Sequence, residues 1–330
     1  MISVEKGYVD MPIDTGIYIK AEIMRLKKEK NAVIMAHYYQ RSEIQDIADY
    51  IGDSLALAQI AARVDADIII MCGVHFMGET AKILCPDKKV IVPDMNGGCS
   101  LAESCPADKF TSFVAEYPNH IVISYVNTSA AVKAHTDIVV TSSNAKEIVE
   151  SLPKDEKIIF GPDRNLGNYI NSITGRNMLL WDGACDVHEK FSTEKIIDLK
   201  KLYKDAKILV HPECKSSLQN IADKVGSTQA LLNFAINDDC NTFIVATESG
   251  ILHEMQRKCP NKKFIPAPPN ENKECNECSY MKLITLEKLY NSLKYELPEI
   301  KVEKEIADKA VLSIKRMLEI SEKLGLINKK

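Results

Sequence analysis

NAVIMAHYYQRSEIQDIADYIGDSLALAQ (residues 31–59) begins with a short apolar run that ends in three polar rings, those of His37, Tyr38 and Tyr39. The run is aliphatic and too short for a helix, so we expect a buried β-strand. The helical pattern that follows favours a strand and helix unit of a parallel sheet. Strand alternation predicts that His37 and Tyr39 face a common side and that Tyr38 turns towards packing.

The same arrangement occurs three times along the chain. The first strands are AVIMAHYY (32–39), IVISYVNT (121–128) and AKILVHPEC (206–214), which place His37, Tyr125 and His211 at spacings of 88 and 86 residues. Second apolar runs follow in ADIIIMCG (66–73), TDIVVTSS (136–143) and NTFIVATE (241–248), and third runs in KVIVPD (89–94), KIIFGPD (157–163) and KKFIPAP (262–268). Apolar strands that alternate with helices predict three small α/β units with parallel sheets, and the alternative is a single doubly wound sheet.

The ends of these strands locate a candidate binding site. In open parallel sheets, ligands bind beyond the carboxyl ends of the strands. If the three units face one centre, the side chains that follow the strands share a pocket, and these are His37, Tyr39, Tyr125, Asn127, Ser142, Ser143, His211, Glu213 and Thr247.

One cysteine follows the closing strand of each unit, and these cysteines are Cys99, Cys185 and Cys278. Three thiolates around one centre suit an iron–sulfur cluster with one iron open to substrate. Two alternatives remain: a zinc site that combines CNEC (275–278) with CSLAESC (99–105), and unrelated buried thiols. Five further cysteines lie in or beside apolar segments and are expected in the core: Cys72, Cys85, Cys214, Cys240 and Cys259.

Composition limits the class of protein. The 330 residues are 45% hydrophobic and 27% charged, as in a globular protein of several domains. A net charge of −4 argues against a broad surface for nucleic acid or anionic membranes. The sequence has no apolar run of membrane-spanning length and no signal-peptide pattern at its N-terminus, so we expect a cytoplasmic protein.

Ten motifs follow one another along the chain: MAHYYQ, IGDSLALA, CGVHFMGETAKIL, GCSLAESC, YVNTSAAVKA, TSSNA, GPDRNLG, HPEC, GSTQALL and CNECSYMKLITLEKLY. Through these ordered motifs the chain resembles the quinolinate synthase family from about residue 12 to residue 320. The resemblance implies three pseudo-symmetric three-layer (αβα) domains with small parallel sheets around a central active site. We expect these domains at about residues 20–110, 111–200 and 201–290, followed by a C-terminal helical segment at 291–330.

The resemblance also implies an activity and a cofactor. Members of the family condense iminoaspartate with dihydroxyacetone phosphate to quinolinate, with loss of phosphate and two waters, in NAD biosynthesis. A [4Fe-4S] cluster would be held by Cys99, Cys185 and Cys278, which makes Cys275 an additional thiol. An aspartate-oxidising enzyme that supplies iminoaspartate is the expected functional link. An iron–sulfur hydro-lyase and a metal or redox sensor without catalysis are the competing interpretations.

Individual roles follow from the matched motifs. We expect Ser54 and Thr228 to bind substrate carboxylates, although both also suit the N-cap of a helix. The expected ligands of the triose phosphate or its derived intermediate are His37, Asn127, Ser142 and His211. Proton transfer is expected from a Tyr125–Glu213 pair and from Tyr39. The alternative for Glu213 is an ion pair with a lysine, and His188 is a candidate for a position next to the cluster ligands.

Overall fold

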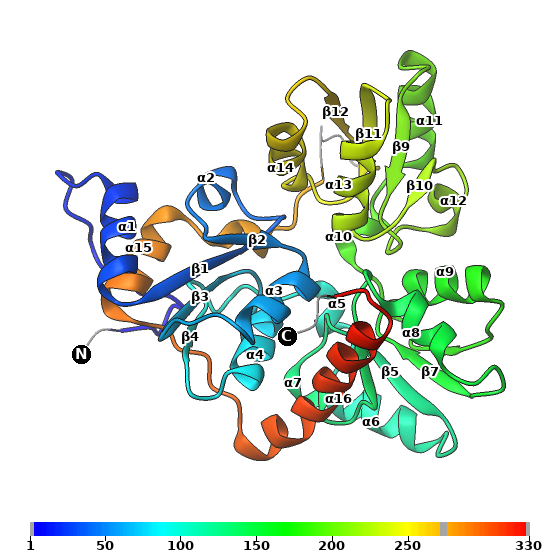
Figure 1. Ribbon diagram of the computed structural model, residues 1–330, viewed down its shortest axis with the longest axis horizontal. Coiled ribbons are helices and arrows are strands. Elements are labelled where there is room, and N and C mark those ends of the chain that lie inside the picture. Colours follow the sequence, from blue (N-terminus) through cyan, green and yellow to red (C-terminus); the bar gives the residue numbers. More distant parts are fainter. Residues whose placement is uncertain (1–2, 271–275, 328–330) are drawn as a thin grey trace.

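The structure, a computed structural model, describes residues 3–270 and 276–327. It contains three sheets of four parallel strands, arranged as three lobes around a common centre (Figure 1). In each sheet the second strand of the chain lies at one edge beside the first strand, and the third and fourth strands extend the other side. The predicted α/β class with three αβα units is therefore confirmed, and the single doubly wound sheet is wrong.

The three repeats use the same order of elements. The first contains α1 (Ile19–Glu29), β1 (Ala32–His37), α2 (Ser42–Gln45), β2 (Tyr50–Gly52), α3 (Ser54–Ala61), β3 (Ile68–Cys72), α4 (His75–Leu84), β4 (Lys89–Ile91) and α5 (Ser100–Glu103). The second contains α6 (Ala107–Ala115), β5 (Ile121–Tyr125), α7 (Ala130–Lys133), β6 (Ile138–Val140), α8 (Ala145–Ser151), β7 (Ile158–Gly161), α9 (Arg164–Thr174), β8 (Leu179–Leu180) and α10 (Asp186–Glu189). The third contains α11 (Thr193–Leu202), β9 (Lys207–Val210), α12 (Ser216–Gln219), β10 (Lys224–Val225), α13 (Thr228–Asn237), β11 (Thr242–Ala246), α14 (Ile251–Lys258) and β12 (Lys263–Pro266).

The order of strands corrects the sequence alignment of the second repeat. The run TDIVVTSS forms the edge strand β6, which corresponds to β2 and β10 and not to the inner strands β3 and β11. The strand of this repeat that corresponds to β3 and β11 is β7, and its fourth strand, β8, was not predicted. The connection before TDIVVTSS is short because it holds only the four-residue helix α7.

An aspartate before each edge strand fixes that strand to its neighbour. In every repeat its carboxylate accepts a hydrogen bond of 2.8 Å from a backbone N–H of the first strand, and its own N–H donates to the carbonyl of the same residue. The three aspartates are Asp49, Asp137 and Asp223, and their spacings of 88 and 86 residues equal those of the first-strand tips. These shared hydrogen bonds give the edge strand and the first strand the same register in all three repeats.

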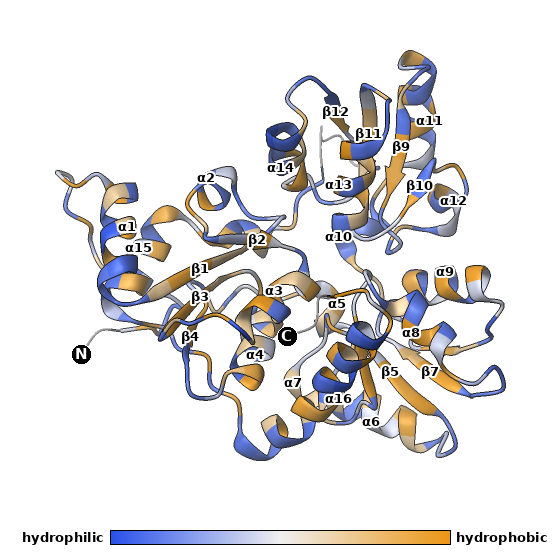
Figure 2. Cartoon of the chain, viewed as in Figure 1, coloured by the Kyte–Doolittle hydropathy of each residue, from blue (hydrophilic) through white to orange (hydrophobic). Residues whose placement is uncertain are grey.

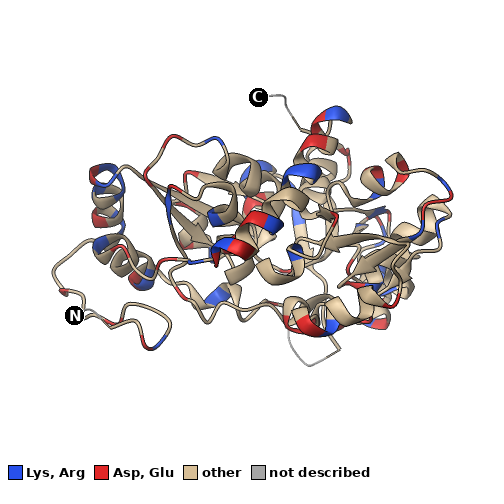
Figure 3. Cartoon of the chain, turned by 90° about the horizontal axis from the view of Figure 1, so that it is seen from below, with Lys and Arg blue, Asp and Glu red and all other residues tan. Residues whose placement is uncertain are grey.

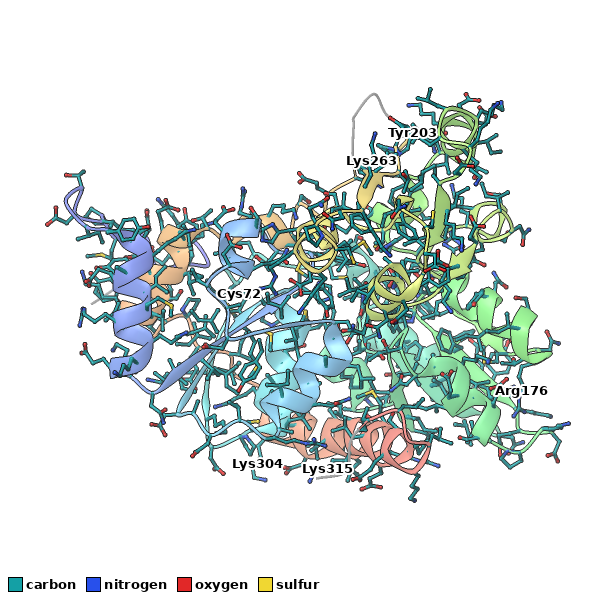
Figure 4. The ribbon with its side chains drawn as sticks, turned by 45° about the horizontal axis from the view of Figure 1, so that its top comes forward. Cys72, Arg176, Tyr203, Lys263, Lys304 and Lys315 are labelled. Carbon is teal, nitrogen blue, oxygen red and sulfur yellow. The ribbon has the colours of Figure 1, made fainter. Side chains whose placement is uncertain are left out.

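Apolar strands lie between helices whose polar residues face outward (Figure 2). One hydrophobic cluster runs through the first and second repeats, and it also contains Ile314 and Met317 of the C-terminal helix. The third repeat has separate clusters on the two faces of its sheet, and one of them includes Tyr38, which confirms that this ring packs. Cys72 lies within the first sheet (Figure 4) and is buried, as are Cys85, Cys214 and Cys259, whereas Cys240 is only half-buried.

The C-terminal segment returns to the first two repeats. After the 3₁₀ turn η1 (Met281–Leu283), helix α15 (Leu286–Tyr295) packs on α1. The helix crosses residue 290, where the sequence predicted a domain boundary. Helix α16 (Lys304–Lys323) packs on α4, α7 and β6, with Lys304 and Lys315 on its outer side (Figure 4). Its buried positions recur every three or four residues, as an amphipathic helix requires.

Acidic and basic residues are interspersed along the helices and loops (Figure 3). Among the described residues, no helix combines the length and the apolar character that crossing a bilayer requires.

Candidate active site

A central cavity of about 140 Å³ lies where the carboxyl ends of the strands from the three sheets converge. All twelve residues predicted as catalytic, substrate-binding or metal-binding line it: His37, Tyr39, Ser54, Cys99, Tyr125, Asn127, Ser142, Cys185, His211, Glu213, Thr228 and Cys278. Ser143, which the strand ends had also suggested, does not line this cavity. The sequence therefore located the pocket, and the atomic contacts below determine what its groups can do.

The pocket repeats one pattern three times. Strand pairing sets His37 opposite Gly52 and Tyr125 opposite Val140, so the tips of the first strands occupy equivalent positions. Each first-strand tip is followed two residues later by a second pocket residue, which is Tyr39, Asn127 or Glu213. The edge-strand position opposite each tip is also followed two residues later by a hydroxyl residue, which is Ser54, Ser142 or Thr228. The 88- and 86-residue spacings of these hydroxyl residues are the sequence signal that would have placed Ser54 and Thr228 in the pocket without the family.

The hydroxyls of Ser54 and Thr228 are not consumed by helix capping. Asp53 is the N-cap of α3, where its side chain accepts a hydrogen bond from Ala56 N. Ser227 is the N-cap of α13. The N-cap alternative is therefore wrong, because Ser54 and Thr228 are the first residues inside their helices and line the cavity.

Glu213 is the buried carboxylate at the centre of the polar contacts. Tyr125 donates its hydroxyl to Oε1 of Glu213 at 2.6 Å, and Nδ1 of His188 lies 3.0 Å from Oε2. Burial alone raises the pKa of a carboxyl group, but the neighbouring imidazoles of His188 and His211 and the hydrogen bonds lower it, so the pKa of Glu213 lies below its ordinary value. Its carboxylate is thus ionised without the lysine partner considered from sequence.

Two imidazoles are neutral donors. Burial lowers the pKa of His37 and of His211 to about 3. In both rings Nδ1 accepts a backbone N–H from two residues ahead, Tyr39 N at 3.2 Å and Glu213 N at 3.3 Å. This network assigns the remaining ring proton of each histidine to Nε2. Each ring can therefore donate one hydrogen bond to an anionic ligand.

Tyr39 has its hydroxyl between two threonines of the third repeat. Its oxygen lies 2.9 Å from Thr228 Oγ1 and 2.7 Å from Thr247 Oγ1. Burial raises the pKa of Tyr39 well above its ordinary value, so the hydroxyl retains its proton near neutral pH. Thr247 does not line the cavity directly, and sequence reasoning found it only as a strand-end residue.

The three pocket thiols fit a positively charged metal group. Burial raises the pKa of Cys99 to about 12, and repulsion from Cys278 adds to this effect. Burial, then Glu213 and then Cys99 raise the pKa of Cys185. Thiols that oppose one another's ionisation need a cation to become thiolates together, and a coordinated metal supplies that charge.

His188 lies beside one of these thiols. Its Nδ1 is 3.2 Å from Cys185 Sγ, and it was singled out from sequence for such a position. The donor atoms of Cys185, His188 and Glu213 lie within 4.8 Å of one another and could also hold a single metal ion.

The zinc alternative from CSLAESC does not fit. Cys105 is buried in a hydrophobic cluster with Phe110, Val122 and Val132, and it does not line the cavity that contains Cys99. Cys275, the other thiol of that proposal, lies outside the described residues.

Behind the pocket, one polar junction joins all three repeats. The hydroxyl of Ser143 lies 2.6 Å from Asp53 Oδ2 and 2.8 Å from Ser227 Oγ. It therefore connects the start of α8 with the N-caps of α3 and α13.

Sequence reasoning also missed a buried ion pair. Lys282 Nζ lies 2.9 Å from Glu248 Oε1 and donates to the carbonyl of Tyr39 at 2.7 Å. Glu248 follows β11, so its place at a strand end was a usable signal. Its pairing with a residue far along the chain could not be predicted from sequence.

Together, these features define a three-repeat α/β protein whose central pocket brings together two tyrosines and an ionised carboxylate, neutral hydrogen-bond donors and three cysteine thiols. A family model described as "Quinolinate synthetase A protein" matches residues 21–319. The quinolinate synthase of Microcystis aeruginosa is 58% identical over 299 residues, which cover 91% of this chain and 94% of that protein. Those of Thermosynechococcus vestitus and a Synechococcus species are 54% and 51% identical, and cover 94% and 97% of this chain and 97% and 99% of their own lengths. The chain belongs to the quinolinate synthase family, whose members are enzymes of NAD biosynthesis.

Proposed function

We propose that this chain condenses iminoaspartate with dihydroxyacetone phosphate to form quinolinate, with release of phosphate and two waters. The observation that carries the proposal is the meeting of Tyr39, Tyr125 and Glu213 with three thiols in one buried cavity. Such a cavity can bind a small anionic substrate, move protons and hold a metal group in the same place. Family membership favours an enzyme over the sensor interpretation.

Anion binding is assigned to neutral donors. Ser54 and Thr228 would bind the carboxylates of iminoaspartate with their hydroxyls. His37, Asn127, Ser142 and His211 would bind the triose phosphate or the intermediate derived from it. The support for this division is that each group lines the cavity and that both histidines keep a proton on Nε2 to donate.

Proton transfer is assigned to the Tyr125–Glu213 pair and to Tyr39. Because Tyr125 donates its hydroxyl proton to Glu213, the phenol oxygen can accept a proton from substrate while its own proton moves to the carboxylate. Tyr39 would serve the isomerisation steps of the triose. Both hydroxyls are buried, so bulk water does not compete for these protons.

We further propose that Cys99, Cys185 and Cys278 hold a [4Fe-4S] cluster with one iron free of protein sulfur. When bound, such a cluster supplies a Lewis acid that favours loss of water from a substrate hydroxyl. A cytoplasmic location is also proposed, and it is supported by the nine described cysteines, all of which are free thiols. An aspartate-oxidising enzyme would supply the iminoaspartate.

The test is anaerobic purification followed by iron and sulfide analysis and by measurement of quinolinate formed from iminoaspartate and dihydroxyacetone phosphate. Serine variants of Cys99, Cys185 and Cys278 should each lose the cluster and the activity. Serine variants of Cys105 and Cys275 should retain the cluster, the first because its thiol packs in a separate core. A full cluster in the Cys185 variant, or zinc in place of iron, would overturn the assignment.

The same assay separates a synthase from a hydro-lyase. Ser142→Ala and His211→Ala should weaken the use of dihydroxyacetone phosphate, since both residues are assigned to the triose phosphate. A hydro-lyase without a phosphate site would be largely unaffected by either change.

A further inference from the structure

One unbroken chain of hydrogen-bond contacts joins Tyr125 to Tyr39 in the pocket. Tyr125 donates to Glu213 at 2.6 Å, and the other oxygen of Glu213 lies 3.0 Å from His188 Nδ1. His188 Nε2 lies 3.0 Å from Thr247 Oγ1, which lies 2.7 Å from the hydroxyl of Tyr39. All five side chains are at most partly exposed, and Glu213, His188 and Thr247 are 2 or 3% exposed.

Thr247, like His188, is a member of this hydrogen-bond chain that has no role in the proposed reaction. It follows β11 of the third repeat, whereas Tyr39 comes from the tip of the first repeat, so their contact crosses between repeats. A hydroxyl has a single hydrogen and can donate to only one of two partners. Nδ1 of His188 faces the Glu213 carboxylate and carries the proton of the neutral ring, so Nε2 is an acceptor. Thr247 then donates its hydrogen to His188 and is left to accept from Tyr39, which sets the direction of the Tyr39 hydroxyl.

The backbone around this contact leaves Tyr39 little freedom. A Cβ on Gly250 would lie 2.8 Å from the backbone of Tyr39, so the loop after β11 is pressed against that residue. Lys282 holds the Tyr39 carbonyl at 2.7 Å. With the main chain fixed in this way, the hydrogen bonds of the hydroxyl decide where its proton and lone pairs lie.

We propose that Thr247 is a positioning residue that fixes the orientation of the Tyr39 hydroxyl in the pocket and ties it, through His188, to the Tyr125–Glu213 pair. The proposal rests on the proposed function only for the catalytic role of Tyr39. Thr247 itself does not line the cavity and acts through Tyr39.

The kinetic test is a double-mutant cycle between Thr247→Val and Tyr39→Phe. Valine preserves the branched shape of threonine and removes both hydrogen bonds. We expect Thr247→Val to lower kcat about tenfold, equal to about 1.4 kcal/mol, with a less than twofold change in KM. Thr247→Ser should restore kcat to within about twofold of the wild type. Because Thr247 acts through Tyr39, the double variant should be no slower than Tyr39→Phe alone.

A matched control is Thr80→Val, because Thr80 is also buried but its hydroxyl only bonds the Phe76 carbonyl of its own helix. This control should keep wild-type kcat. Iron content and thermal unfolding of every variant check that the protein is folded and loaded. Multiplicative loss in the double variant, or failure of serine to rescue, would overturn the proposal.

A second readout needs no turnover. The ¹³Cζ resonance of Tyr39 in tyrosine-labelled protein, assigned by its absence in Tyr39→Phe, reports the hydrogen bonding of the hydroxyl. It should shift in Thr247→Val and return in Thr247→Ser. An unchanged resonance in Thr247→Val overturns the role of Thr247 even if the wild type makes quinolinate. Lack of quinolinate in the wild type, with the expected shifts present, overturns the proposed function alone.

Discussion

Lys133 at the end of α7 is a buried lysine whose ammonium holds the loop that carries Asn127. Its side chain is fully buried, and Nζ donates to the carbonyls of Val126, at 2.8 Å, and of Thr128. These two carbonyls are on either side of Asn127 in the chain. Burial lowers the pKa of Lys133 from 10.5 to about 8. The chain therefore keeps a charge in its interior at the expense of stability.

The magnitude follows from the pKa shift. About 1.36 kcal/mol per pKa unit makes the buried charge cost about 3 kcal/mol below pH 8. Lys133→Met removes that cost but leaves two buried carbonyls without their donor, at about 1–3 kcal/mol each. At pH 7 the two effects nearly offset, and we expect the free energy of unfolding to change by less than about 3 kcal/mol.

The pH dependence is the sharper expectation. A lysine with a lowered folded-state pKa loses its proton first in the folded protein, so its cost is present below pH 8 and disappears as pH rises towards 10.5. Wild type should therefore gain about 3 kcal/mol relative to Lys133→Met over this range. Other groups titrate in both proteins and cancel in the difference.

Urea unfolding of both proteins at several pH values between 7 and 10.5 measures this difference. Lys201→Met is the control, because Lys201 is 72% exposed and should show no such trend. In activity assays, Lys133→Met should raise the KM for dihydroxyacetone phosphate, because Asn127 loses its anchor. A stability difference that is constant with pH would refute the reasoning about the buried charge.

Three further changes test the pocket. Gly250→Ala would place a Cβ 2.8 Å from the Tyr39 backbone and should lower kcat at least tenfold. Gly16→Ala is the control, because the nearest atom to its added Cβ would be 3.6 Å away, and it should keep wild-type kcat. Equal kcat values for the two variants would contradict the close packing of Gly250 on Tyr39. Ser143→Ala breaks the junction of three repeats and should lower the free energy of unfolding by about 1–2 kcal/mol, and unchanged denaturation curves would argue against the junction. Glu213→Gln should lower kcat about 10²–10⁴-fold. Adding Tyr125→Phe to this variant should lower kcat little further, because the two residues act as one hydrogen-bonded pair. Multiplicative losses in the double variant would show that they act independently.

The sequence predicted the pocket because its side chains sit at fixed places in a repeated pattern. Polar residues at the ends of apolar strands and one cysteine per unit are local features, and parallel sheets bring such ends together. The side-chain contacts of the pocket residues could not be predicted in this way. The contacts of Thr247, His188 and Lys282 join segments far apart in the chain, and they depend on how the repeats pack against each other.

The misassigned strand of the second repeat has a physical cause. Edge strands are usually half-exposed, and β2 and β10 are short and partly exposed without a long apolar run. β6 is buried at every position because α16, from the C-terminal end of the chain, covers it. A covered edge has the composition of an inner strand, so TDIVVTSS resembled ADIIIMCG although it occupies the position of DYIGD.

The hydrophobic clusters are not shared equally among the three repeats, and this indicates which repeat ligand binding stabilises most. The first and second repeats share one hydrophobic cluster, and α16 packs on both of them. The third repeat joins the others through polar contacts near the pocket, such as Gln45 to the Gly250 carbonyl and Tyr38 to Gln229, together with the packing of Tyr38. A ligand that contacts strand tips from all three repeats adds interactions at this less apolar interface. We infer that substrate binding stabilises the placement of the third repeat more than it stabilises the shared core of the first two.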